Sequence, residues 1–134
     1  NAKSKQDLLK AITDNWYWVL STSKMIDANY LEENFTEEEL TEAGIYTRKE
    51  HTSNAKSFAC GSATVKAYGS ATVEACGSAT VKAYGSATVK AYNNSYVEDC
   101  TGNINTVSDH GIVKDYYNHK IYIKKGKFEI IEIE

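Results

Sequence analysis

Apolar and polar residues alternate with a period of two through the middle of the chain. In residues 61–68, GSATVKAY, the apolar side chains of Ala63, Val65 and Ala67 alternate with serine, threonine and lysine. This alternation predicts a β-strand with a small apolar face turned inward. The glycine and serine at the start favour a turn, because glycine tolerates a positive φ.

The same eight-residue pattern repeats without interruption. Four near-identical octets follow one another at residues 61–68, 69–76, 77–84 and 85–92. Weaker copies occupy residues 53–60, 93–100 and 109–116, whereas residues 101–108 keep little of the pattern. Equivalent octets that stack in parallel place identical residues above one another. The chain is therefore predicted to be mainly β, an octapeptide-repeat β-solenoid, rather than a hairpin meander.

The number of octets per coil is the next question. Two octets would give a flattened solenoid of two sheets, and three would give a triangular one. The thin Ala-Val-Ala interior favours two sheets, and thus 16 residues per coil. Charge leaves the choice open, because Glu74 would lie beside Lys90 but Lys66 beside Lys82.

A helical segment is expected before the repeats. Leu8, Ile12, Trp16 and Val19 or Leu20 recur at helical spacing, and a second short helix is expected at residues 25–33. A Thr-Glu-Glu-Glu sequence at residues 36–39 predicts a capping box, and a third helix would end at Gly44. These helices would cap the open first edge of the solenoid.

A β-hairpin of residues 121–123 and 128–133 is expected to cap the other end, with alternating Glu and Lys protecting its edge. One compact domain would then consist of a helical cap at 1–44, a solenoid at 45–118 and a β-hairpin cap at 119–134. Dimers of a solenoid, end to end or side by side, are compatible with this organisation.

The octets resemble the [DG]-[NS]-A-T-V-x-A-Y repeats of small β-solenoid proteins of gut Bacteroidetes and their phages or mobile elements. Residues 34–45 are similar to the segment that leads into those repeats, and residues 121–134 resemble their C-terminal strand pair. The resemblance implies a β-solenoid and a phage or mobile-element setting. The family has no assigned activity, so the resemblance carries no catalytic or binding residue.

Composition narrows the class of protein. The 134 residues carry a formal net charge of −3, whereas nucleic-acid-binding domains are usually basic. Three cysteines, Cys60, Cys76 and Cys100, lack the spacing of a disulfide framework or a zinc site. No apolar run approaches the roughly 20 residues that span a bilayer. A cytoplasmic protein without cofactor or metal is expected.

Two charged clusters are candidate binding surfaces. The acidic one is a candidate partner-binding site and consists of Glu32, Glu33, Glu37, Glu38, Glu39 and Glu42. The basic one lies near the other end and consists of Lys120, Lys124, Lys125 and Lys127. Both are compatible with plain solvated caps. The sharper hypothesis makes the acidic cluster a docking surface that steers a basic partner protein.

Two rows of repeated side chains are further candidates. A threonine ladder of Thr64, Thr72, Thr80 and Thr88 resembles ice-binding arrays, although simple β-propensity also explains it. A tyrosine row of Tyr68, Tyr84, Tyr92 and Tyr116 accompanies Lys66, Lys82, Lys90 and Lys114. Such a row can stack single-stranded nucleic acid, or it can simply cover a narrow core at the corners. Cysteines at the same octet position favour corner packing.

Catalytic chemistry has no recognisable motif in this chain. The titratable candidates are His51, His110, His119, Asp109, Asp115 and Cys100. Their spacings define no nucleophile, base and orienting group. The sequence therefore predicts a non-enzymatic protein-interaction scaffold, with modulation of a host protein by a phage or mobile element as the specific hypothesis. The alternatives are a nucleic-acid-associated protein that uses the Lys/Tyr rows, and an ice-binding-like or purely structural solenoid.

Overall fold

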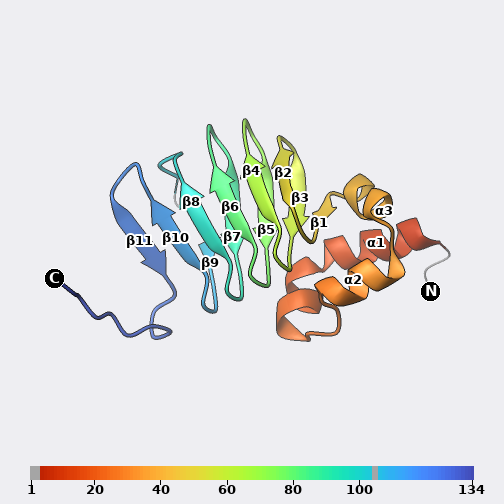
Figure 1. Ribbon diagram of the computed structural model, residues 1–134, viewed down its shortest axis with the longest axis horizontal. Coiled ribbons are helices and arrows are strands. Elements are labelled where there is room, and N and C mark those ends of the chain that lie inside the picture. The colour runs from red at the N-terminus through yellow and green to blue at the C-terminus, as the bar shows by residue number, and fades with distance from the viewer. Residues whose placement is uncertain (1–3, 104–105) are drawn as a thin grey trace.

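Two β-sheets, parallel except for the last strand, face one another in the computed structural model, which describes residues 4–103 and 106–134 (Figure 1). Within those residues, sheet A has the order β1 (Ile45–Tyr46), β3 (Lys56–Ala59), β5 (Thr72–Ala75), β7 (Thr88–Ala91) and β9 (Thr106–Val107). Sheet B has the order β11 (Lys120–Ile123), β10 (Ile112–Asp115), β8 (Tyr96–Asp99), β6 (Thr80–Ala83), β4 (Thr64–Ala67) and β2 (Glu50–Ser53). From β1 to β10, successive strands along the chain alternate between the sheets, so the chain is a β-solenoid.

Strand register confirms two octets per coil. Val65 lies beside Val81 in sheet B, and Val73 lies beside Val89 in sheet A, in both cases 16 residues apart. The same register places Lys66 beside Lys82 and Glu74 beside Lys90, as a 16-residue coil predicts.

Small side chains fill the space between the sheets. The core consists of alanines and valines that are completely buried, and it runs the length of the solenoid. Its members include Ala67, Val73, Val81, Val89 and Val97. Protein interiors are close-packed, so side chains of this size fix the narrow separation of the two sheets.

The corners of the coils require a left-handed backbone. Gly61, Gly69, Gly77 and Gly85 all have φ near +60°. Further along, Asn93 and Asp109 adopt the same conformation at φ 54° and 53°. These are the side chains that tolerate this region best, which explains how the weaker octets keep the corner without glycine.

The helical segment follows the predicted pattern closely. Helix α1 (Lys5–Asp14) starts at the N-cap Ser4, and a π-helical turn η1 (Trp18–Thr22) follows it. Helix α3 (Glu37–Glu42) has the predicted capping box: the Thr36 hydroxyl accepts from the backbone of Glu39, whose carboxylate accepts from the backbone of Thr36.

The second helix begins later than the sequence predicted. Helix α2 spans Ala28–Asn34, not residues 25–33. Asp27 sets its start, because its carboxylate accepts a hydrogen bond of 2.9 Å from the Tyr30 backbone N–H and so caps the helix.

The cap covers one long corner of the solenoid in addition to its first edge. Trp16 packs on Phe58 of sheet A at 5.2 Å between ring centroids, and Tyr17 packs on Tyr92 at 4.3 Å. One apolar cluster therefore joins the helices to the corner row Cys60, Cys76 and Tyr92. Residues 1–3 of the expected cap lie outside the described residues.

The C-terminal hairpin is formed by a different pair of strands from the predicted one. Strand β11 pairs antiparallel with β10, whereas the segment after Gly126, residues 128–133, forms no strand. The turn between β10 and β11 explains the difference. Asp115 accepts hydrogen bonds from the backbone of Tyr117 and from both the backbone and the amide of Asn118, so the chain reverses one strand earlier than expected.

Candidate interaction surfaces

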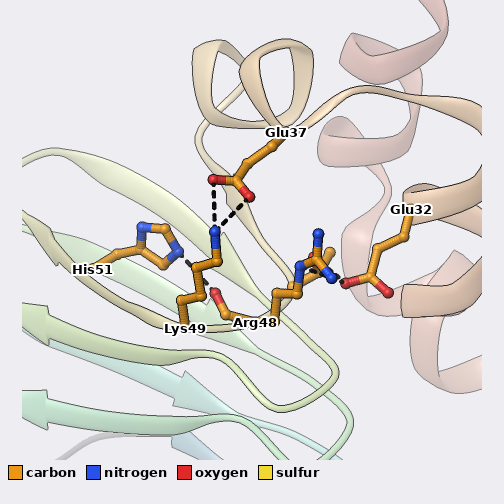
Figure 2. A network of polar contacts seen from close by, with 6 residues as sticks. Glu32, Glu37, Arg48, Lys49 and His51 are labelled. Atoms are coloured by element: carbon orange, nitrogen blue, oxygen red, sulfur yellow. Dashed lines mark hydrogen bonds and ion pairs between the residues drawn. The ribbon is translucent and has the colours of Figure 1, made fainter.

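The acidic cluster is divided between paired and unpaired carboxylates, and Figure 2 shows the contacts of the paired Glu32 and Glu37. Glu32 accepts a hydrogen bond of 2.8 Å from the Thr47 hydroxyl and lies 3.7 Å from Arg48 Nε. Glu37 binds Lys49 Nζ through both oxygens, at 3.1 and 3.3 Å. These two glutamates thus attach the helices to the loop before β2, and their charge is already compensated within the chain.

Of the remaining four carboxylates, one has partners within the chain and three are exposed without an ion pair among the described residues. Glu39 belongs to the capping box and lies 3.4 Å from Lys5 Nζ. Glu33, Glu38 and Glu42 are exposed, and no ion pair involves them among the described residues. Three glutamates in the first turn of α3 also stabilise that helix electrostatically. Only Glu33, Glu38 and Glu42 remain as candidates for contact with a basic partner.

Local contacts lower the pKa of two carboxylates of the cluster, Glu37 and Glu39. The Lys49 ammonium group lowers the pKa of Glu37, first through its hydrogen bond and then through its charge. The backbone N–H of Thr36 lowers the pKa of Glu39. The cavity beside Glu32, Arg48 and His51 is small, about 50 Å³, which is room for a few water molecules.

The threonine ladder is split between the two faces of the solenoid. Thr64 and Thr80 are neighbours in sheet B, whereas Thr72 and Thr88 are neighbours in sheet A. Beyond Thr80 the next residue in sheet B is Tyr96. The four threonines thus form two separate pairs, and within the part of the chain that the structure describes neither face carries the flat hydroxyl array that the ice-binding alternative requires.

The tyrosine row is split between the two corners. Tyr68 and Tyr84 stack at 5.0 Å between centroids with an interplanar angle of 13°. Tyr92 lies at the opposite corner under Tyr17, with 8% of its surface exposed. Burial raises the pKa of Tyr92 to about 12.

The lysines beside the tyrosines are only partly available. Lys66 Nζ lies 2.7 Å from Glu50, which compensates its charge. Lys90 belongs to sheet A and lies beside Glu74, on the other face from Lys66 and Lys82. Lys114 lies over the ring of Tyr116 at 4.6 Å. The row that a single strand of nucleic acid would follow is therefore interrupted.

Three of the six catalytic candidates, His51, His110 and Asp115, are held by separate local contacts. His51 Nε2 lies 2.8 Å from the Arg48 carbonyl oxygen, and its ring stacks on Tyr46. His110 packs edge-on against Phe128. The Asn118 side chain and backbone lower the pKa of Asp115, which serves the turn before β11. Among the described residues, no three His, Cys, Asp or Glu side chains are grouped closely enough to hold a metal ion.

The reactivity of each cysteine thiol should depend on the corner of the solenoid at which it lies. Cys60 and Cys76 are buried beneath the cap, and burial raises the pKa of both thiols, that of Cys76 to about 12. Cys100 is exposed at the other corner. A thiol reagent at pH 8 should therefore modify one cysteine of the native chain and all three after denaturation, as counted by mass spectrometry. Rapid native modification of three thiols would contradict the packing of the cap.

One exposed aromatic residue on the cap was missed by the sequence analysis. Trp18 begins η1 with 53% of its surface exposed, and Met25 follows that turn with 68% exposed. The helical pattern considered only the buried series that ends at Leu20. The sequence does contain a signal for the exposure of Trp18. A residue two positions after the buried Trp16 falls on another face of the helix, so Trp18 cannot belong to the buried series.

The fold and these surfaces define a class: a two-sheet parallel β-solenoid with a helical cap. No family model, curated protein or solved structure matches the chain. Within the described residues, none of the helices has the length and apolar character that crossing a membrane requires.

Proposed function

We propose that the protein is a non-enzymatic scaffold that binds another protein through its helical cap. The observation that carries this proposal is the exposed Trp18 on η1. Tryptophan is enriched among the residues that contribute most to protein–protein binding, because it buries a large area with little loss of side-chain entropy. Met25, on the turn that follows, adds an adaptable apolar side chain.

The segment that carries Trp18 is firmly attached to the solenoid. The neighbouring Tyr17 packs on Tyr92, and the Ser21 hydroxyl donates a hydrogen bond of 2.9 Å to Asn93. Ser23 closes the turn by donating its backbone N–H to the Trp18 carbonyl at 2.8 Å. A rigidly mounted aromatic binds with less entropic cost than one on a mobile loop.

The charge of the cap suggests the chemistry of the partner. Glu33, Glu38 and Glu42 are exposed, and they would attract a basic protein and increase its association rate. A bacterial or phage cytoplasm, with the protein acting on a host protein, is the setting that we propose for this scaffold.

Affinity capture from bacterial lysate, analysed by mass spectrometry with and without nuclease, tests the proposal. The wild-type chain should retain a specific basic protein that survives nuclease, and Trp18→Ala should lose at least 90% of it. Such a loss corresponds to about 1.4 kcal/mol or more, which is typical of a dominant interface residue. Because Trp18 is largely exposed, the variant should melt within a few degrees of wild type.

The matched control is Tyr117→Ala, which removes another exposed aromatic residue at the far end of the solenoid. This variant should bind the partner as wild type does. If Trp18→Ala captured as much partner as wild type, the proposal that the cap is the binding surface would be wrong. Loss of every partner on nuclease treatment, together with a steep decrease of binding with salt, would favour the nucleic-acid alternative.

A further inference from the structure

The C-terminal segment has the composition of a strand but no strand partner in the structure. Residues 128–134 read FEIIEIE, with Ile130, Ile131 and Ile133 exposed by 72%, 74% and 90%. The three isoleucines are β-branched residues, which favour pairing in a sheet. Figure 1 shows that the segment runs outward from the end of the solenoid instead of lying along β11.

The last strand of sheet B has a matching free edge. Among the described residues, β11 pairs with β10 on one side and with no other strand. Ile121 on this strand is 64% exposed. An uncovered edge of this kind presents backbone N–H and C=O groups that can bind an additional strand.

Charge makes the two segments complementary. The edge strand and the turn after it are basic, with Lys120, Lys124, Lys125 and Lys127. The C-terminal segment is acidic, with Glu129, Glu132 and Glu134. An antiparallel pairing that places Ile130 opposite Tyr122 also places Ile131 opposite Ile121 and Glu132 opposite Lys120. Opposite charges and apolar side chains in such cross-strand pairs stabilise a sheet.

We infer that the C-terminal segment binds the free edge of β11 in a second copy of this chain, and that the two copies exchange these segments symmetrically. Each copy carries both the acidic segment and the basic edge, so one two-fold axis satisfies both pairings. The resulting dimer joins two solenoids end to end and covers both free β11 edges.

The turn after β11 reverses the chain, and an aromatic contact that follows it holds the segment away from its own β11. Lys127 donates its backbone N–H to the Lys124 carbonyl at 3.3 Å, and Gly126 has φ +85°. Phe128 then packs edge-on against His110, beside the turn that precedes β10. Because Phe128 is held beside the turn before β10, the residues after it run outward and leave the edge of their own β11 open (Figure 1).

Sedimentation of the wild-type chain and of Ile131→Lys tests the dimer. Wild type should be dimeric, and the variant should raise the dimer dissociation constant about tenfold or more, because each dimer loses two apolar pairs and gains two charges beside basic edges. Met25→Lys is the matched control, since it places the same charge at an equally exposed apolar position on the distant cap. It should leave the dimer unchanged. A wild-type chain that sediments as a monomer overturns the inference.

Cross-linking tests the exchange itself. In a Cys100→Ser background, chains with Ile121→Cys and chains with Ile131→Cys carry tags of different size and are mixed under mild oxidation. They should form a covalent heterodimer, whereas Ile130→Cys, on the other face of the segment, should not link to Ile121→Cys. If a disulfide forms only when both substitutions are in one monomeric chain, the segment folds back on its own β11 and the inference is wrong.

Discussion

Replacement of Cys76 by tyrosine, the residue found most often at the eighth position of the octet, should destabilise the protein strongly. Cys76 is 1% exposed and lies 3.4 Å from the Ser21 hydroxyl, within the cluster that joins the cap to the solenoid. A tyrosine ring has no space there, so the cap would have to move away. Overpacking of this kind costs roughly 3 kcal/mol, which lowers the melting temperature by about 10 °C.

The matched control for Cys76→Tyr is the same substitution at Cys100. Cys100 occupies the same octet position at the other corner, where it is exposed and follows the stacked pair Tyr68 and Tyr84. Cys100→Tyr should change the free energy of unfolding by less than about 0.5 kcal/mol. Thermal melts followed by circular dichroism measure both variants. Similar effects at the two positions would show that the cap does not cover the corner of Cys76.

Glycine-to-alanine substitutions at two corners should also differ greatly. At Gly77 an added Cβ would lie 2.9 Å from the backbone nitrogen of Gly61, and φ is +61°. At Gly69 φ is +60°, but the space around an added Cβ is open. A left-handed backbone costs an alanine roughly 1 to 2 kcal/mol at either corner. Gly77→Ala must in addition push two stacked turns apart.

We therefore expect a loss of roughly 1 kcal/mol for Gly69→Ala and of at least about 3 kcal/mol for Gly77→Ala. Chemical denaturation measures this difference, from the midpoint and slope of the unfolding curve of each variant. Both alanines have the same conformational cost, so this cost cancels in the difference between the two losses of stability. The difference therefore measures the cost of the steric clash between successive turns at Gly77. Equal losses would mean that the coils are not stacked as tightly at the corner of Gly77 as the structure shows.

Both comparisons concern positions that are nearly equivalent in the sequence. Gly69 and Gly77 each open an identical GSATV sequence, and Cys76 and Cys100 each close an octet. Local propensity treats the members of each pair alike. The differences arise from what lies against them in space, which is the helical cap or the preceding coil.

The repeat by itself determined the architecture of the solenoid. Period-two alternation of alanine, valine and polar residues defined the inward face, and exact repetition favoured stacking over a meander. The thin Ala-Val-Ala interior led to the 16-residue coil. The helices were predictable because Leu8, Ile12 and Trp16 recur at helical spacing and the residues after Thr36 form a capping box, although Leu9 rather than Leu8 is the leucine that is fully buried.

Only the tertiary structure decided which equivalent positions are covered and which remain open. Tyr92 is buried and Tyr68 is exposed because the helical segment packs on one corner and not on the other. Glu32 and Glu37 are not available to a partner protein because they form ion pairs with Arg48 and Lys49. These two cations lie in a loop that the charge pattern of the sequence did not indicate as a partner of the acidic cluster. Identical octets contain identical local information, so the choice between them depends on contacts between segments that are distant along the chain.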